Sequence, residues 1–257
     1  MNEWALITGG SMGIGYELAK VLAANKFNLV LVARSDDRLR KVAEELRAQN
    51  GVEIKILVKD LSLPNSPQEI FNALRDTPIS ALVNNAGFGW RGAFAECDLQ
   101  AQALEMMRVN MDSLVALTRL FLPPMLARKQ GRILNVASTA AFQPGPFANI
   151  YFATKAFVLS FSQALAEELE GTGVTVTALC PGSTRTEFFE RAGMKNSRPE
   201  WHMMDASVVA EAGYGGMMRG KRVVIPGLVN KLTATLANFV PTGVTTKIVR
   251  KLNRAQP

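Results

Sequence analysis

The first fifteen residues constrain the fold of this chain more than any other segment. Trp4–Thr8 is a short apolar run typical of a buried strand, and a glycine-rich turn follows directly at residues 9–15. Apolar residues then recur at three- and four-residue spacing, which predicts a helix. Strand, glycine turn and helix in this order are typical of a dinucleotide-binding unit, because glycines let the backbone approach a pyrophosphate and the helix N-terminus offers free N–H groups. The turn alone is weak evidence, since its Thr-Gly-x-x-x-Gly-x-Gly spacing differs from the commoner G-x-G-x-x-G.

A second pattern, Tyr151 with Lys155, indicates proton-transfer chemistry. Residues four apart on a helix lie on one face, so the phenol and the ammonium are expected to be neighbours. A phenol has a pKa of about 10, and an adjacent cation stabilises the phenolate and lowers that pKa toward neutral pH. The hydroxyl of Ser138, upstream, can hold a substrate oxygen beside the phenol. The three side chains together predict acid–base catalysis on a carbonyl or an alcohol.

The rest of the chain predicts an α/β fold built from alternating strands and helices. Buried parallel strands are expected at residues 28–34, 52–58, 81–84, 132–137 and 174–179, with a last strand at 222–226. Amphipathic helices are expected at residues 36–49, 66–75, 99–128 and 151–170. Pro123 and Pro124 predict a kink or an early stop in the third of these helices. The candidate functional groups follow the strands, where open α/β sheets bind their ligands.

The ordered set of motifs resembles the short-chain dehydrogenase/reductase family. The matching segments span residues 4–186 and are Thr8–Gly15, Asp60-Leu61, Asn84–Gly87, Asn110, Ser138, Tyr151-x-x-x-Lys155, Pro181-Gly182 and Thr186. Each segment alone is weak, whereas the ordered set is specific. The resemblance implies a Rossmann-type, doubly wound parallel β-sheet with helices on both faces.

The resemblance also implies roles for individual residues. The implied catalytic tetrad consists of Asn110, Ser138, Tyr151 and Lys155. Tyr151 would be the acid/base and Ser138 the substrate clamp; Lys155 would bind the nicotinamide ribose and tune the tyrosine, and Asn110 would support a water leading to Lys155. The implied cofactor contacts are Gly9, Ser11, Met12, Gly13, Ile14, Gly15, Arg34, Ser35, Asp60, Leu61, Asn85, Ala86, Gly87, Tyr151, Lys155, Pro181, Gly182, Thr184 and Thr186. No metal site is expected.

The end of the second strand bears on the choice of cofactor. Enzymes that use NAD commonly carry an acid there, which binds the ribose 2′-hydroxyl. Ala33 stands at that place, and Arg34 and Ser35 follow it. An arginine offers a planar, permanently charged fork that suits a 2′-phosphate, so NADP(H) is favoured over NAD(H). The alternative is that Arg34 is merely solvated and that Asp36 or Asp37 binds the ribose hydroxyl. Against this alternative, Asp36 or Ser35 is more plausibly the N-cap of the next helix.

Two classes of function fit these motifs. The first is an NADP(H)-dependent oxidoreductase that interconverts a carbonyl and a secondary alcohol. The second is a non-catalytic NADP(H)-binding scaffold or redox sensor, which has no physical need for all four tetrad groups. Methionine and aromatic side chains near the motifs favour an apolar or bulky substrate, such as a ketone, a 3-oxoacyl compound or a steroid, although they can equally be ordinary core. They are Phe88, Trp90, Phe142, Phe147 and, in a segment that commonly forms a substrate lid in this family, Phe188, Phe189, Met194, Trp201, Met203 and Met204.

Length and composition predict a cytoplasmic protein of one main domain. The 257 residues include no stretch of eighteen apolar residues, and the first strand begins too early to leave room for a signal peptide. Two cysteines do not make a disulfide framework, and Cys180 is expected to be a buried structural thiol. The only histidine, His202, has no partner that would make it a metal ligand or a base.

The C-terminal segment departs from this plan and carries the basic excess of the chain. Residues 1–226 are expected to form the catalytic domain, and residues 227–257 a basic amphipathic helical extension. From residue 212 onward there are eight basic residues and no acidic one, which leaves 21 of the 29 basic residues against 22 acidic ones elsewhere. This distribution argues against nucleic-acid binding by the body. Two apolar stripes (Leu228, Leu232, Leu236 and Phe239, then Val244, Ile248 and Leu252) are expected to pack on the body or on another subunit of a homo-oligomer, and peripheral contact with an anionic membrane is the alternative.

Overall fold

A seven-stranded parallel sheet forms the centre of the protein. The computed structural model describes residues 3–187, 203–237 and 239–254. The strands are β1 (Trp4–Thr8), β2 (Asn28–Ala33), β3 (Ile54–Val58), β4 (Ile79–Asn84), β5 (Gly131–Val136), β6 (Val174–Leu179) and β9 (Val223–Val224). Their order is β3-β2-β1-β4-β5-β6-β9, and every neighbouring pair is parallel. This doubly wound order confirms the predicted fold class.

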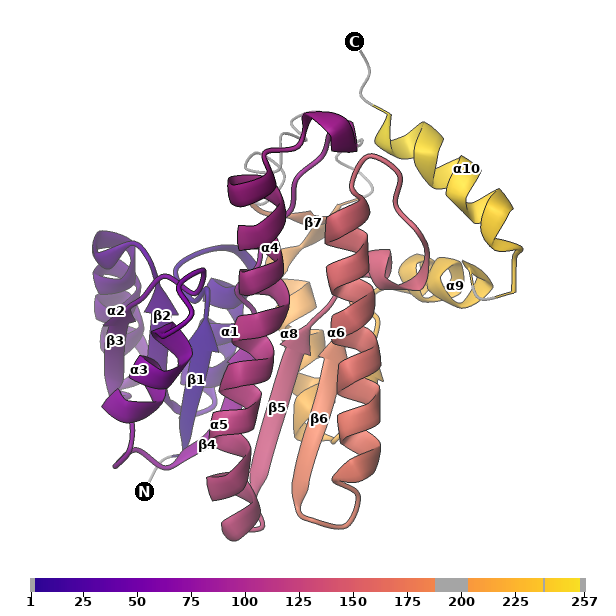
Figure 1. Cartoon of the computed structure of the whole chain (residues 1–257). Coiled ribbons are helices and arrows are strands. Elements are labelled where there is room, and N and C mark those ends of the chain that lie inside the picture. The colour runs from indigo at the N-terminus through magenta and orange to yellow at the C-terminus, as the bar shows by residue number, and fades with distance from the viewer. Residues whose placement is uncertain (1–2, 188–202, 238, 255–257) are drawn as a thin grey trace.

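Helices cover both faces of the sheet because the strands are apolar on both faces. In β1, Ala5 and Ile7 belong to the core under α1 (Gly13–Ala24), α2 (Asp36–Asn50) and α8 (Ala206–Met218). Leu6 belongs to the opposite core, under α3 (Ser66–Ala73) and α5 (Ser113–Ala127). A third cluster lies between the sheet and α6 (Asn149–Glu168). Figure 1 shows α5 and α6 in front of β5 and β6, with α8 behind them.

The helical segment that carries Asn110 differs from the prediction in its internal hydrogen bonding. A continuous helix runs from Leu99 to Ala127, but two stretches, η2 (Leu99–Leu104) and η3 (Arg108–Asp112), are π-helical, with the short α4 (Glu105–Met107) between them. The early stop predicted at Pro123 is wrong, because α5 includes Pro123 and Pro124 and ends only at Ala127. Pro123 and Pro124 cannot donate backbone hydrogen bonds to the carbonyls one turn earlier, yet the helix continues past them to Ala127.

Helix α8 is not predicted from the sequence, because glycines interrupt its apolar pattern. They serve close packing instead. A Cβ on Gly213 would lie 2.7 Å from a methyl carbon of Leu179 in β6, and a Cβ on Gly216 would overlap the side chain of Val224 in β9. The small residues therefore let α8 approach the sheet more closely than any side chain would allow.

The C-terminal segment forms two helices, α9 (Leu228–Ala237) and α10 (Thr242–Asn253). Their inner faces are buried through Ala234, Thr245, Val249 and Asn253. The two apolar stripes predicted to pack on the body face outward instead and are exposed, so that expectation is wrong for the body of this chain. In Figure 1, α9 and α10 lie beside the layered body, and α10 extends away from it.

Within the described residues, no helix combines the length and the apolarity needed to cross a bilayer. The predictions for Phe188, Phe189, Met194, Trp201 and His202 fall outside the described residues. Met203 and Met204 are described, and Met204 begins β8 (Met204–Asp205), which pairs with β7 (Thr184–Arg185) in a small parallel sheet.

Candidate active site

The turn between β1 and α1 has the backbone that its glycines predict. Gly9 and Gly13 adopt φ values of +66° and +55°, which side chains rarely allow. A Cβ on Gly15 would overlap the carbonyl oxygen of Gly9, so only glycine lets the first turn of α1 approach the loop this closely. The N–H groups of the first turn of a helix have no partner within that helix. The turn therefore offers donors to an anion together with room for it.

The loop after β4 is fixed to the glycine turn by Thr8 and Asn85. The hydroxyl of Thr8 accepts hydrogen bonds from the backbone N–H groups of Asn85 and Ala86, both at 3.0 Å. The Asn85 amide donates to the carbonyls of Thr8 at 2.9 Å and Gly9 at 3.3 Å. Two loops that are far apart in sequence thus form one rigid rim at the carboxyl ends of the strands.

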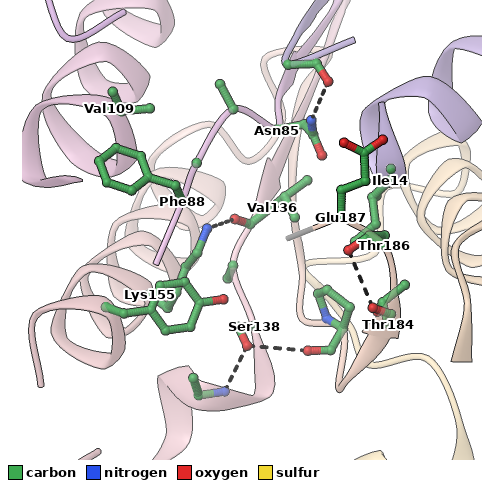
Figure 2. A pocket seen from close by; sticks show the side chains of 18 of the residues that line it. Ile14, Asn85, Phe88, Val109, Val136, Ser138, Lys155, Thr184, Thr186 and Glu187 are labelled. Atoms are coloured by element: carbon green, nitrogen blue, oxygen red, sulfur yellow. Dashed lines mark hydrogen bonds between the residues drawn. The ribbon is translucent and has the colours of Figure 1, made fainter. Parts of the chain in front are cut away.

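Ser138, Tyr151 and Lys155 meet across this rim, as their spacing predicts. Ser138 follows β5; its hydroxyl accepts from the N–H of Ala140 at 3.1 Å and donates to the carbonyl of Pro181 at 3.4 Å. The ammonium of Lys155 lies 5.8 Å from the centre of the Tyr151 ring and donates to the carbonyl of Val136 at 2.8 Å. Figure 2 shows the bonds of Lys155 and Ser138 within one cavity.

Burial dominates the protonation of this cluster. Tyr151 is half-buried in the cavity wall, and desolvation raises its pKa from 10.0 to about 12, partly opposed by a hydrogen bond with Ser138. Desolvation also lowers the pKa of Lys155 from 10.5 to about 8. The expectation that Lys155 lowers the tyrosine pKa toward neutral pH is therefore wrong for this structure. At neutral pH the phenol carries its proton and the lysine its charge, which is the state of a proton donor.

Asn110 lies behind the cavity, in the π-helical stretch η3. Its side chain is almost completely buried and bonded on both sides, accepting from the N–H of Phe88 at 3.1 Å and donating to the carbonyl of Phe88 at 3.0 Å and the hydroxyl of Thr154 at 3.1 Å. A Cβ on Gly87 would come within 3.0 Å of the Asn110 amide oxygen and 3.4 Å of the Lys155 ammonium. Because Gly87 has no side chain, the loop after β4 can approach both Asn110 of η3 and Lys155 of α6.

A single cavity of about 730 Å³ joins the glycine turn to the Tyr151 cluster. The structure brings nearly all predicted site residues into its lining; Gly15 and Asn110 stand immediately behind it and shape it through the contacts above. The predicted residues in the lining are Gly9, Ser11, Met12, Gly13, Ile14, Arg34, Ser35, Asp60, Leu61, Asn85, Ala86, Gly87, Ser138, Tyr151, Lys155, Pro181, Gly182, Thr184 and Thr186.

The end of the cavity at β2 is basic. The side chain of Arg34 is 66% exposed, and its guanidinium lies 3.9 Å from the carboxylate of Asp60. Ser35 is the N-cap residue of α2, and Asp36 is paired with Arg40 at 2.8 Å. Asp36 and Asp37 were the two acids considered for a ribose hydroxyl, and neither lines the cavity. Arg34 and Ser35 remain in the lining, where a phosphate would meet a cation and a hydroxyl.

The comparisons with known proteins decide the family. The sequence pattern described as short chain dehydrogenase matches residues 3–197 of the chain. This chain is a member of the short-chain dehydrogenase family. The prediction of an oxidoreductase that acts on carbonyl and alcohol groups is confirmed at that level.

Individual relatives of this short-chain dehydrogenase agree with that assignment. The very-long-chain 3-oxoacyl-CoA reductase of Bos taurus is 33% identical over 246 residues, which cover 93% of this chain and 77% of that protein. Among solved structures, a short-chain dehydrogenase from Sphingobium yanoikuyae in complex with NADPH is 33% identical, with a TM-score of 0.84 over 99% of this chain and 98% of that one. A bulky-bulky ketone specific alcohol dehydrogenase from Comamonas testosteroni is 32% identical, with a TM-score of 0.80 over 99% and 96%.

The cavity of this dehydrogenase also contains residues that sequence reasoning missed. Arg38 contacts the sulfur of Met12 at 3.7 Å and the carboxylate of Glu187 at 3.0 Å, and it lies in the first turn of α2. Its place near the start of the helix that follows Arg34 and Ser35 is the signal that could have identified it. At the other end, Val109, Gln143, Phe152 and residues of α9 and α10 complete the wall; Figure 2 shows Val109 and Phe88 on the side of Lys155.

Of the aromatic and cysteine residues singled out in the sequence, some line the cavity and others belong to the core. Of the aromatic residues expected near the site, Phe88 lines the cavity, whereas Phe142 packs against the core cluster beneath α6. Trp90 packs over Gly92. Cys180 is fully buried, and desolvation raises the pKa of its thiol to about 12, so it is the inert structural thiol that was predicted.

Proposed function

We propose that this protein is an NADP(H)-dependent carbonyl reductase or alcohol dehydrogenase with Tyr151 as its acid/base. The observation that carries the proposal is the shared cavity: a protonated phenol, a serine hydroxyl and a buried ammonium stand at one end, and a glycine turn stands at the other. A redox sensor would need the glycine turn but not the buried lysine, whose burial is costly.

The residues of the cavity fit NADP(H). Gly13, Ser11 and Ile14 at the start of α1 would hold the pyrophosphate, because their backbone faces the cavity and a side chain at Gly13 would fill it. Arg34 and Ser35 would hold the 2′-phosphate, with Arg38 as a second cation. The NADPH in the Sphingobium yanoikuyae relative supports this choice. When bound, this cofactor supplies or accepts the hydride.

The side chains would handle the proton and the substrate oxygen. Ser138 would hold the carbonyl oxygen with its hydroxyl, which is fixed by Ala140 and Pro181. Tyr151 would donate its proton to that oxygen in reduction and take it back in oxidation. Lys155 would place a positive charge near the phenolate left behind, which offsets the desolvation that holds the pKa of Tyr151 at about 12. Asn110 would position the loop at Phe88 against α6.

The proposed substrate is a ketone or secondary alcohol with a large apolar group. Phe88, Val109, Phe152 and Leu252 supply apolar surface at the tyrosine end of the cavity. Two relatives act on substrates of this kind by their names, very-long-chain 3-oxoacyl-CoA in one case and bulky ketones in the other. Apolar side chains around a few polar groups are the usual composition of such a site.

Turnover of NADPH with a panel of ketones tests the function. The panel should include 3-oxoacyl thioesters, steroids, sugars and quinones, and the bulky apolar members should react fastest. Tyr151→Phe keeps the ring but removes the proton carrier, so turnover should fall by about 10²–10⁴-fold while NADPH binding is retained. Tyr214→Phe, in α8 and outside the cavity lining, is the matched control and should keep full activity. Near-normal turnover by Tyr151→Phe would refute the assigned role, and NADPH binding without turnover of any substrate would favour the sensor.

A further inference from the structure

Helices α9 and α10 each present a row of exposed apolar side chains, and the two rows together are here called the C-terminal face. On α9, Leu228, Val229, Leu232 and Leu236 are 54–73% exposed, and Phe239 just beyond it is 80% exposed. On α10, Val244, Ile248 and Leu252 are 49–57% exposed. A surface with so many neighbouring apolar side chains is typical of a docking site rather than of a solvated face.

The charged residues on these two helices are all basic. Lys231 lies on α9, and Lys247, Arg250, Lys251 and Arg254 lie on or just after α10; all five are exposed. Within the part of the chain that the structure describes, none of the five forms an ion pair. No acidic residue follows Glu211 in the sequence, so the C-terminal segment itself contains no carboxylate side chain that could neutralise these cations.

We propose that the C-terminal face docks on an anionic lipid surface. The apolar side chains would enter the headgroup region, and the five cations would meet the lipid phosphates, which is the arrangement of interfacial amphipathic helices. A second copy of this chain fits less well. A two-fold interface brings the same patch of both subunits together and would set these unpaired cations against one another.

The location of the face gives docking a consequence for the cavity. Asn230, Thr233 and Ala234 of α9 and Leu252 and Asn253 of α10 line the same cavity as Tyr151. Leu252 belongs both to the lining and to the exposed face. Docking would thus place the cavity rim at the lipid surface, from which an apolar substrate can enter. This last step rests on the proposed function, whereas the docking itself does not.

Sedimentation of the full chain with lipid vesicles tests the proposal without any activity measurement. The protein should sediment with vesicles of phosphatidylcholine and phosphatidylglycerol, less with pure phosphatidylcholine, and less again as salt is raised. Lys247→Gln with Lys251→Gln should weaken binding about 25-fold, since each basic residue near an anionic surface contributes about fivefold. Lys41→Gln with Lys129→Gln removes the same charge from exposed positions elsewhere and should have little effect.

The apolar side chains are tested separately. Leu232→Ser with Leu236→Ser should abolish sedimentation and leave the melting temperature unchanged, because both side chains are exposed. Leu63→Ser is the control, since Leu63 is 58% exposed, like Leu236, but follows β3 at the opposite edge of the sheet. Absence of binding to anionic vesicles would overturn the proposal. So would a dimer, seen by analytical ultracentrifugation, that Leu232→Ser with Leu236→Ser dissociates while vesicles bind neither form.

Discussion

Replacing Lys155 by methionine should stabilise the ligand-free protein while it removes activity. Lys155 is only 5% exposed, and burial lowers its pKa from 10.5 to about 8. The folded protein therefore binds this proton less tightly than the unfolded chain does, so the charge costs folding free energy at neutral pH. Methionine is also unbranched, is one heavy atom shorter than lysine and removes the charge.

The magnitude follows from the two pKa values. At about 1.4 kcal/mol per pH unit, a pKa lowered from 10.5 to about 8 costs about 3 kcal/mol at pH 7. The variant also loses the hydrogen bond from Lys155 to the Val136 carbonyl, which contributes about 1 kcal/mol. The net gain is about 2 kcal/mol, or a rise in melting temperature of about 4–8 °C for a chain of this size.

The dependence on pH gives this prediction its sharpest test. Below pH 8 the penalty is nearly complete, because both the folded and the unfolded wild type then carry the proton and the folded state binds it less tightly. As pH rises from 8 to 10.5 the folded lysine is already neutral, so the wild type gains stability and the advantage of the variant shrinks toward zero near pH 9.5. Denaturant unfolding at pH 7 and pH 9.5 measures both differences. A less stable variant at pH 7, or an advantage that does not change with pH, would refute the reasoning.

A control variant separates the effect of removing a buried charge from the effect of replacing a lysine by methionine at any position. Lys26 also donates to a backbone carbonyl, that of Asn50 at 3.0 Å, but it is exposed. Lys26→Met should therefore change stability by less than about 0.5 kcal/mol at either pH, as expected for a surface substitution.

Two further variants test the cofactor end of the cavity. Arg34→Ala should weaken NADPH binding by about 10–150-fold, the effect of about 1.5–3 kcal/mol for a hydrogen bond to a charged group, and leave NADH nearly unaffected; fluorescence titration of both cofactors measures this, and equal losses would assign Arg34 a general structural role. Gly15→Ala should lower both cofactor affinity and melting temperature, because the new Cβ would overlap the Gly9 carbonyl oxygen. Gly243→Ala, at a glycine of α10 without a positive φ whose Cβ would contact nothing, controls for the substitution itself, and an unchanged affinity for NADPH in Gly15→Ala would contradict the packing argument.

The parts of the fold that were predicted correctly are those where local pattern and tertiary packing agree. The strand at Val174–Leu179 is predicted to the residue, because it is a pure apolar and β-branched run that is buried on both faces. Helix α8 is missed because its glycines are selected by contact with Leu179 and Val224, which are distant in sequence. Pro123 was predicted to end or kink its helix from the local rule for proline, but the helix continues to Ala127.

The same distinction holds for the site. Tyr151 and Lys155 were placed by helical spacing and do share the cavity. The pKa of Tyr151 was expected to fall, yet desolvation raises it, since burial depends on the whole surrounding structure and not on one neighbouring charge. The parts of the cavity wall that α9 and α10 supply could not be predicted either. Periodicity shows which side of a helix is apolar, but not which side faces the body of the protein.

The bonds from Arg91 to α10 join two segments that are far apart in the sequence. Its guanidinium donates to the backbone carbonyl of Asn253, 162 residues further on, and to that of Leu252 at 3.1 Å. Chains are synthesised from the N-terminus, and early segments fold first. The glycine turn and the strands around it can therefore assemble while the far wall of the cavity is still unmade. The far wall closes only once residues 252 and 253 have been synthesised and their carbonyls have met Arg91, so a cofactor cradle can exist before the substrate chamber does.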